Sequence, residues 1–466
     1  MNRHKPEFTL QKHTERLGSA PLPALLLKLS LPGIAATVMT SLYNIVDTFW
    51  VGKLGYEAIA ALTIVFPYQI LAVAIGMGTG VGISALVSRR FGENDLGATN
   101  HVAGQTFFLC IFWGSIFLLA PLLFPDPILR AIGATPDIMD YSRTYLIITS
   151  FGAPAHIFII VAGNLIRGSG DAIKPMVIMI TASVLNIIMD PFLIIGYGPF
   201  PALGVQGAAL ATVIAQGIGA LIGLYYLLGN RTSFRFNLRN ALPSWPILKD
   251  IYRVGGPASI QEVTESLAFI LFNKVVSSFG SEAIAAVGLL IRISDLAFMP
   301  IMGVSNALLP VVGFNFGAKN EKRLWSSVKL ATFVVTVLLG LFTIVIEIWT
   351  PQIVRIFSDD PQVLAVAVPG MRIGLATLVF IGANIMFVTA FQGMARGGMA
   401  LFLSLIRQFL LFVPLLYLLR YFLELTGVWL ALPASDILSF VVTFLVLYRF
   451  YARRKKLYPE PPVWST

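Results

Sequence analysis

Long, continuous apolar runs separated by short polar turns dominate the chain from about residue 25 onwards. Each run could cross a hydrocarbon core of roughly 30 Å as a helix, and none shows the strict alternation of a β-barrel strand. The pattern predicts an all-α integral membrane protein with about twelve transmembrane helices. The predicted spans are 25–51, 57–88, 100–124, 139–166, 172–197, 205–229, 249–278, 283–313, 325–350, 364–394, 400–422 and 428–451.

The first part of the chain returns in the second part. Residues 32–95 align without a gap on 257–320, with 19 identities in 64 pairs and an offset of 225. A weaker match continues beyond it, in which Arg167-Gly168 resembles Arg396-Gly397. The paired residues include Pro32 with Pro257 and Gly55 with Gly280 and, at an offset of 223, Gly204 with Gly427 and Pro191 with Pro414. Because each repeat holds an even number of helices, we expect two parallel six-helix repeats.

The repeats define the expected domains. These are a cytoplasmic N-terminal segment 1–23, a first lobe 24–229, a cytoplasmic linker 230–248, a second lobe 249–452 and a cytoplasmic tail 453–466. With both termini inside, 25 of the 33 Lys and Arg residues fall on the inner side, Arg407 among them, and Arg292 falls within a span. The seven on the outer side are Lys53, Arg130, Arg143, Lys274, Arg355, Arg372 and Arg420. This bias is typical of the positive-inside rule.

Composition excludes several functions. Only 12% of the residues are charged, mean hydropathy is +0.81, and the net charge of +10 follows the membrane topology, so no nucleic-acid partner is expected. The single cysteine, Cys110, allows no internal disulfide and no cysteine metal site. Motifs for nucleotide binding, zinc binding or nucleophilic catalysis are missing. The sequence therefore predicts no enzyme, no cofactor and no metal, and a transporter would draw its energy from an ion gradient.

Two aspartates within predicted spans occur in the first repeat only. Asp47 follows Asn44 by three residues, and Asp190 follows Asn186 by four, so each pair shares a helix face. The repeat alignment places Phe272 opposite Asp47 and Val413 opposite Asp190. A carboxylate at bilayer depth costs roughly 2.5–3.5 kcal/mol to insert and usually faces a cavity or a partner. A shared structural need would not leave the acids in one repeat alone, which favours a functional role.

Alternatives remain open at these positions. Two nearby carboxylates in a low dielectric cannot both ionise easily and would titrate jointly, so they could exchange a proton near neutral pH. With neighbouring amide and hydroxyl oxygens they could instead hold Na⁺. The structural alternative is that each aspartate caps a helix end or pairs with a base in a loop.

The second repeat has its own polar residues in predicted spans. Glu262 and Glu265 lie about one helical turn apart. Arg292 and Asp295 are three residues apart and are expected to pair with each other. Three further residues carry weaker predictions: Glu347 and Asp436 are placed near an interface, and His156 is expected to be packed or hydrogen-bonded. The glycines at 76, 78, 80 and 82 favour close helix packing, with a bendable gate as the alternative.

Several segments resemble the multidrug and toxic compound extrusion (MATE) family, and the match covers nearly the whole chain. Asn44-Ile45-Val46-Asp47-Thr48 resembles the opening signature of the family, Asn164-Leu165-Ile166-Arg167-Gly168 the end of its fourth helix, and Leu185-Asn186 through Asp190-Pro191 its fifth. Gly204-Val205-Gln206-Gly207 resembles its sixth. The resemblance is closest to the prokaryotic branch of DNA-damage-inducible-type transporters. It implies a V-shaped antiporter whose two lobes open alternately inward and outward.

The resemblance also implies roles for individual residues. The coupling-ion network would comprise Asp47, Asp190, Asn186 and Thr212, with Asn44 beside it and Asn164 nearby. Pro32 would be the bend of the first helix. Glu265 matches an acid of a Na⁺-coupled branch, whose tenth-helix aspartate is missing here, and Asn384 is the nearest polar residue. The substrate or second-cation candidates are Asn164, Glu265, Glu262, Asn384 and Arg292.

The sequence as a whole predicts a multidrug efflux antiporter in a prokaryotic inner membrane. It would act as a monomer in the lipid bilayer and export amphipathic, mostly cationic drugs or metabolites in exchange for H⁺, with Na⁺ as the alternative coupling ion. A lipid or lipid-linked precursor flippase is the main rival, but its cavity would need several basic groups, and only Arg292 and Lys274 are available. A passive channel or receptor is disfavoured by the asymmetric acids.

Overall fold

The computed structural model describes residues 16–198, 201–229 and 231–457, without the side chains of Tyr56, Glu57 and Leu238. This part of the chain is 88% helical and contains no strand. Residues 1–15 of the expected N-terminal segment, 458–466 of the expected tail and position 230 of the expected linker lie outside the described residues.

The first lobe contains six long helices and a short one. The long helices are α2 (Leu22–Gly52), α3 (Tyr56–Gly92), α4 (Leu96–Leu123), α6 (Met139–Gly168), α7 (Ile173–Ile194) and α8 (Val205–Leu228). The short helix α5 (Pro125–Ile132) was not predicted, because one face is apolar and the other polar. It is tied to α6 by hydrogen bonds from Arg143 to Asp126, including Nε to Oδ1 at 2.8 Å, and these bonds hold the pKa of Asp126 below its ordinary value.

The second lobe departs further from regular helices. Its elements are α9 (Trp245–Val276), η2 (Ser277–Phe279), α10 (Ser281–Gly317), α11 (Glu321–Arg355), α12 (Pro361–Leu375), α13 (Leu378–Gly393), α14 (Gly397–Leu405), the π-helix η3 (Ile406–Phe412) and α15 (Val413–Leu457). The 3₁₀ helix η1 (Leu238–Ala241) lies between the lobes in sequence. α12 and α13 form one span bent by 43°. α15 changes direction at Glu424, whose backbone is not helical.

Twelve spans result, as the sequence predicted. Nine helices of the described residues are long and apolar enough to cross a membrane, and the bent α12–α13 pair is a tenth. The ninth of these segments, 397–456, breaks at Glu424 and therefore provides two crossings. The remaining span is α9, which is 32 residues long and packs along α3 despite its charged side chains.

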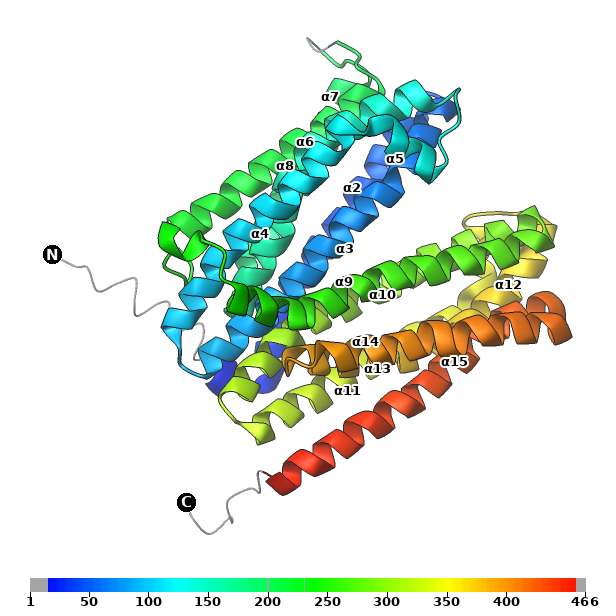
Figure 1. The fold of residues 1–466 in the computed structure, drawn as a ribbon. Helices are drawn as coiled ribbons and strands as arrows, with labels where there is room; N and C mark the ends of the chain where they lie inside the picture. Colours follow the sequence, from blue (N-terminus) through cyan, green and yellow to red (C-terminus); the bar gives the residue numbers. More distant parts are fainter. Residues whose placement is uncertain (1–15, 199–200, 230, 458–466) are drawn as a thin grey trace.

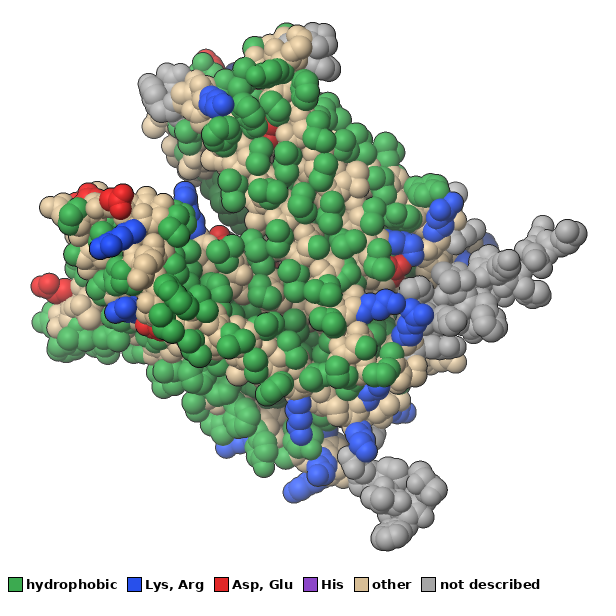
Figure 2. All heavy atoms as spheres, turned by 180° about the vertical axis from the view of Figure 1, so that it is seen from behind, with side chains coloured by type: hydrophobic (Ala, Val, Ile, Leu, Met, Phe, Trp, Pro, Cys, Tyr) green, Lys and Arg blue, Asp and Glu red, His purple; other side chains and the backbone are tan. Residues whose placement is uncertain are grey.

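The two lobes form a V (Figure 1). Their helices diverge toward the end that carries α5 and α12, here named the open end, and converge at the opposite end, here named the closed end. Each lobe has its own buried apolar core. The lobes meet where α3 packs against α9 and α10, and where α2 packs against α10. Lys and Arg side chains gather at the closed end, as Figure 2 shows.

The duplication is visible in the backbone. Gly55 and Gly280, which are 225 residues apart, precede α3 and α10 with φ of 115° and 104°. Asn94 and Lys319, also 225 apart, have φ of 61° and 56°. The same offset joins Gly170 with Ala395, the positive-φ residues between α6 and α7 and between α13 and α14. The expected match of Arg167-Gly168 with Arg396-Gly397 is therefore wrong, since the backbone pairs Gly168 with Gly393.

A second correction concerns the last helix of each repeat. A side chain at Gly207 would meet the Leu193 carbonyl oxygen at 2.1 Å, and one at Gly427 would meet that of Leu419 at 2.0 Å. These identical contacts make Gly207 the partner of Gly427, so the predicted pairing of Gly204 with Gly427 is wrong. They also pair Leu193 with Leu419, which are 226 residues apart. Asp190 then corresponds to Leu416 instead of Val413, and its counterpart is still apolar.

The offset changes from 225 to 226 between α14 and the start of α15, which is where the π-helix η3 lies. A π-turn closes its hydrogen bond one residue later than an α-turn, so it absorbs one extra residue without breaking the helix. The second repeat therefore differs from the first by a one-residue insertion in this span. The π-helix carries Arg407 and Gln408, whereas the matching residues 181–186 of α7 contain no charged side chain.

The turn into the last span predicts a stabilising substitution. Glu424 has φ 51° and ψ −130°, and its counterpart Gly204 has φ 57° and ψ −131°. Only glycine adopts this conformation without steric cost, and a non-glycine residue there costs of order 1–3 kcal/mol. Glu424→Gly is therefore expected to raise the stability of the folded protein by about 1 kcal/mol. Thermal unfolding in detergent measures it, with Glu282→Gly as the control; an unchanged or lower midpoint would contradict the strain.

Candidate functional site

The first-lobe aspartates lie on neighbouring helices. Asp47 is on α2 and Asp190 is on α7, close enough for the charge of Asp47 to act on Asp190. Asp190 is fully buried, and Asn186 is 2% exposed. The Asn186 amide Nδ2 donates a hydrogen bond of 3.2 Å to the Thr212 hydroxyl on α8. The structure therefore places Asp47, Asp190, Asn186 and Thr212 in one region of the lobe.

The carboxylates lack donors. Both oxygens of Asp190 and Oδ1 of Asp47 are buried without a hydrogen-bond partner among the described residues, and so is Oδ1 of Asn186. A buried carboxylate without donors is costly as an anion and is stabilised by a bound proton or cation. Within the described residues, no three His, Cys, Asp or Glu side chains are grouped to hold a metal ion. The chemistry supported here is the binding and release of a proton or a monovalent cation.

Sequence reasoning missed two tyrosines of this network. Tyr43 on α2 and Tyr145 on α6 both feel the charges of Asp47 and Asp190, and the Tyr145 hydroxyl also interacts with the Gln69 side chain of α3. Tyr43 precedes Asp47 by four residues, and this spacing was a usable signal. Tyr145 and Gln69 are far away in sequence, and nothing local marks them.

The structural alternative for Asp47 does not hold. The nearest base in sequence, Lys53, lies over the rings of Phe49 and Trp50, 4.6 and 4.2 Å from their centroids. Among the described residues, no ion pair includes Asp47 or Asp190. Neither aspartate is a helix cap, since α2 continues to Gly52 and α7 to Ile194.

The other first-lobe candidates lie outside this network. The Asn44 side chain is exposed, although its backbone carbonyl accepts a hydrogen bond from Thr48. Asn164 lies four residues from the closed end of α6, where its amide donates to the Ile160 carbonyl and packs against Gly80. Pro32 lies inside a continuous α2. His156 is hydrogen-bonded to Gln216 at 3.2 Å, as predicted.

A cavity of about 390 Å³, largely apolar but with several polar side chains, lies in the second lobe and reaches α3 of the first. Its wall includes Phe272, the counterpart of Asp47, so the two repeats place different chemistry at one position. Four predicted residues line it: Glu262, Glu265, Asn384 and Asp295. Other polar side chains of the lining are Gln261, Ser294, Ser305, Asn306, Thr389, Gln392, Ser404, Arg407, Gln408, Ser435 and Asp436. The space-filling view shows an acidic group in the notch between the lobes (Figure 2).

The predicted pairing of Arg292 with Asp295 is wrong. No ion pair of the described residues joins them; Arg292 is exposed and does not line the cavity, whereas Asp295 does. A spacing of three residues permits an ion pair but does not enforce one, because a pair at exposed positions gains little stability. The basic residue of this lining is Arg407, which had been placed on the cytoplasmic side. It lies ten residues into its span and pairs with Asp436 at 3.1 Å.

Of the two acids expected near an interface, Asp436 differs from the expectation and Glu347 does not. Asp436 is 3% exposed and is held by Arg407 and by the Thr377 hydroxyl at 3.2 Å, so it belongs to the interior of the lobe. Glu347 on α11 pairs with Arg372 on α12, with 3.9 Å between Oε2 and Nε. Both side chains are partly exposed.

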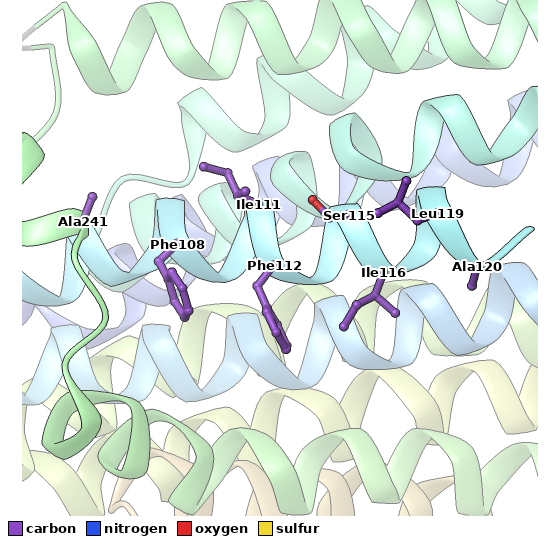
Figure 3. Close-up of a pocket in the computed structure, with 8 residues that line it drawn as sticks. All are labelled: Phe108, Ile111, Phe112, Ser115, Ile116, Leu119, Ala120 and Ala241. Carbon is purple, nitrogen blue, oxygen red and sulfur yellow. The ribbon is translucent and has the colours of Figure 1, made fainter. Parts of the chain in front are cut away.

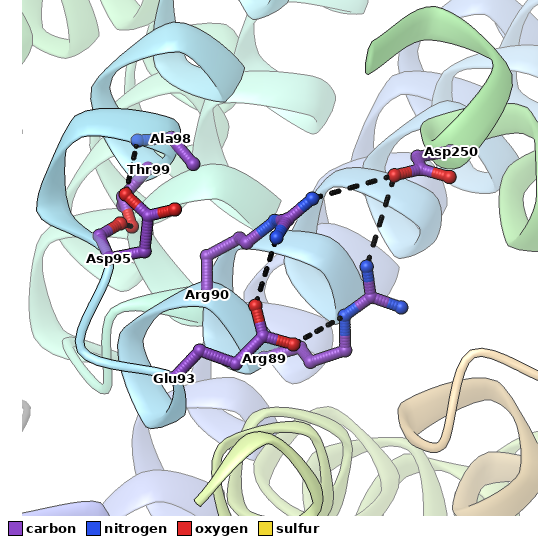
Figure 4. A network of polar contacts seen from close by, with 7 residues as sticks. All are labelled: Arg89, Arg90, Glu93, Asp95, Ala98, Thr99 and Asp250. Atoms are coloured by element: carbon purple, nitrogen blue, oxygen red, sulfur yellow. Dashed lines mark hydrogen bonds and ion pairs between the residues drawn. The ribbon is translucent and has the colours of Figure 1, made fainter. Parts of the chain in front are cut away.

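Charged side chains join the lobes at the closed end (Figure 4). Arg89 and Arg90 of α3 both reach Asp250 of α9, at 3.9 and 3.7 Å, and both also contact Glu93. The segment before α2 adds a second connection, because Arg323 donates to the carbonyl oxygens of Leu17 and Ala20. Partly exposed pairs of this kind stabilise weakly and can break and re-form.

Glycines bring the backbones of the two lobes together. A side chain at Gly78 would meet the backbone nitrogen of Ser259 at 2.4 Å, and one at Gly82 would meet the carbonyl oxygen of Ile251 at 2.3 Å. Gly80 and Gly76 instead pack against Asn164 and Ile160 within the first lobe. The structure therefore shows the close packing expected of this cluster.

A larger hollow, of about 570 Å³, lies elsewhere and has a different character. It runs along one face of α4 and ends at Ala241 of η1, and its side chains are almost entirely apolar (Figure 3). Ile111 is 68% exposed and Phe112 is 45% exposed. Such a surface is suited to hydrocarbon, since lipid tails cover exposed apolar side chains at this depth.

Comparison with known proteins gives the family. The family described as MatE matches the chain twice, over residues 32–192 and 257–418. The matches begin 225 residues apart and end 226 apart, in agreement with the insertion at η3. Two relatives are the multidrug export protein MepA of Staphylococcus haemolyticus, 27% identical over 92% of this chain and 93% of its own length, and an FAD transporter of Shewanella oneidensis, 28% identical over 94% and 97%.

The fold is shared with solved structures. One is described as an outward-facing conformation of a multidrug resistance MATE family transporter. It has a TM-score of 0.89 and 28% identity, and the match covers 95% of this chain and 98% of that one. With its two repeats, its twelve spans and these matches, the chain is a multi-pass membrane transporter that belongs to the MatE family.

Proposed function

We propose that this transporter is a multidrug efflux antiporter that exports amphipathic, mostly cationic organic compounds in exchange for H⁺. The observation that carries the coupling proposal is the carboxylate pair of Asp47 and Asp190, in which both oxygens of Asp190 and Oδ1 of Asp47 are buried without a hydrogen-bond donor among the described residues. A proton can enter such a site and leave it without breaking an ion pair. Na⁺ is the alternative ion, because the surrounding amide and hydroxyl oxygens suit a hard cation.

The placement of charge supports an orientation of the transporter in the membrane. We assign the closed end to the cytoplasm because the basic residues gather there, as the positive-inside rule requires. The open end then faces outward, and protons from the outer side reach Asp47 and Asp190. Neutralising the pair changes the contacts that α2 makes with α7, and Pro32 is the position at which α2 bends most easily. Drug release outward is followed by return to an inward-open state.

The substrate class is supported by the second-lobe cavity and by one relative. The cavity is largely apolar, has four acidic side chains and has a volume suited to a drug-sized molecule. The MepA relative is described as a multidrug export protein, whereas the FAD transporter shows that relatives at the same similarity carry other cargo. The structure does not favour a flippase, since Arg407 is the one basic side chain among the described lining residues.

Efflux driven by separate gradients tests the proposal. In proteoliposomes, ethidium transport is expected to follow an imposed pH gradient and to stop when a protonophore collapses it. A Na⁺ gradient at equal pH on both sides is expected to drive none. Transport that requires Na⁺ and ignores the pH gradient would overturn proton coupling and keep the antiporter. Lipid scrambling without ethidium transport would overturn the efflux function itself.

A further inference from the structure

The second-lobe cavity is bipolar. Its acids Glu262 and Glu265 belong to α9, and Asp295 belongs to α10. Its cation Arg407 belongs to the π-helix η3 of another span. The three acids of α9 and α10 therefore lie apart from the Arg407–Asp436 ion pair around one space of about 390 Å³.

Arg407 has unused hydrogen-bonding capacity. A guanidinium has five N–H donors. Its Nε donates to Asp436 at 3.1 Å, and its terminal nitrogens have no hydrogen bond within the described part of the chain. Asp436 is held on its other oxygen by Thr377. Asp436 thus fixes the orientation of the guanidinium, and the terminal N–H groups form a fork that suits the two oxygens of a carboxylate.

Two buried amide groups in the lining have oxygen atoms that a bound ligand could pair with. Gln408, next to Arg407, is 7% exposed, and its Oε1 has no partner among the described residues. Asn384 is 5% exposed; its Nδ2 donates to Ser439 at 2.8 Å, and its Oδ1 is likewise without a partner. Both residues line the cavity. Unpaired buried acceptors are costly, and N–H groups of a bound molecule would satisfy them.

We propose that Arg407 forms a carboxylate subsite and that this cavity binds zwitterionic amphiphiles. The carboxylate of the ligand lies on the terminal nitrogens of Arg407, and its ammonium group faces Glu262 and Glu265. The subsite belongs to the second repeat alone, because the first repeat has neither the insertion nor a charge in the matching segment. The inference rests on the proposed efflux function only in taking the ligand as a transported one.

Direct binding to purified protein tests the subsite without any gradient. The probes are a piperazinyl fluoroquinolone, which is zwitterionic near neutral pH, and its methyl ester, which keeps the ammonium and loses the carboxylate. The variant is the double substitution Arg407→Gln with Asp436→Asn, which removes both charges together and keeps a hydrogen-bonding pair. A single Arg407→Gln change would leave Asp436 buried without its cation.

The expected result is a loss of affinity of about tenfold or more for the zwitterion, with affinity for the ester unchanged within about twofold. Arg407→Lys keeps the positive charge and loses the forked guanidinium. Its affinity for the zwitterion should therefore lie between that of the unsubstituted protein and that of the double variant. Equal loss for both probes, or no loss for either, would overturn the subsite. Ethidium has no carboxylate, so its efflux by the unsubstituted protein is measured separately as the test of the proposed function. If the unsubstituted protein showed no ethidium efflux, that result would count against the proposed function and would leave the binding result unaffected.

Discussion

Asp190→Asn is expected to abolish drug efflux while the protein remains folded in the membrane. The amide has nearly the shape of the carboxylic acid but cannot release or take up a proton. Asp190 is fully buried and in no ion pair of the described residues, so the substitution breaks no structural contact. Removing a buried charge without a partner should leave the stability unchanged or raise it. Asp47→Asn is expected to have the same effect on efflux.

Resistance of cells to ethidium measures the loss, with membrane expression and thermal unfolding as checks on folding. Both variants should fall to the level of cells without the transporter. Thr48→Val is the matched control, because Thr48 is an exposed neighbour on α2 that bonds only to its own helix. Full resistance of the Asp190 variant would remove this carboxylate from the coupling site.

Gly82→Ala is expected to prevent normal closure of the lobes and to reduce transport at least tenfold. One added methyl group would lie 2.3 Å from the Ile251 carbonyl oxygen and 2.9 Å from the Gly255 nitrogen. Both are backbone atoms of α9, so no rotamer change relieves the clash, and α3 and α9 must separate. The ion pairs of Arg89 and Arg90 with Asp250 are too weak to restore the contact. The closed end should therefore spend more time open.

Spin labels on the two lobes measure this opening. His101 and Lys322 are exposed helical residues of α4 and α11, and each can be replaced by a labelled cysteine once Cys110 is changed to alanine. The Gly82 variant should lengthen the distance between the labels. Gly76→Ala is the control, since its methyl group would contact only the Ile160 side chain at 3.5 Å. An unchanged distance together with full transport would show that the backbone contact is dispensable.

Hydropathy was sufficient to predict the membrane-spanning helices. Each span must satisfy the hydrogen bonds of its own backbone and be apolar over a fixed length. The break between α12 and α13 was not predictable, since no proline or glycine pair marks it. The depth of Arg407 was missed for a related reason. A charge with a buried partner is compatible with a span, and that partner, Asp436, lies 29 residues further along the chain.

The repeat alignment shows where sequence reasoning fails. Between residues 32 and 95 the identities are dense, and the offset of 225 holds in the backbone. Further on, small and apolar residues recur by chance, so Gly204 with Gly427 seemed a match although the structure pairs Gly207 with Gly427. The conclusion about Asp190 survived the error because every neighbouring position of the second repeat is apolar. Among the aspartates' surroundings, Tyr43 could have been found from its spacing, whereas Tyr145 required the fold.

The single extra residue of η3 makes the two six-helix halves different, and this difference determines what a protein built from two copies of one half would contain. A six-helix half paired with a second copy of itself would be a homodimer with two carboxylate networks and no counterpart of Arg407, or with two copies of Arg407 and no network. The present chain has one carboxylate network and one Arg407, so its two halves are not equivalent. Replacing either half by a copy of the other should preserve the V and remove either the carboxylate network or Arg407.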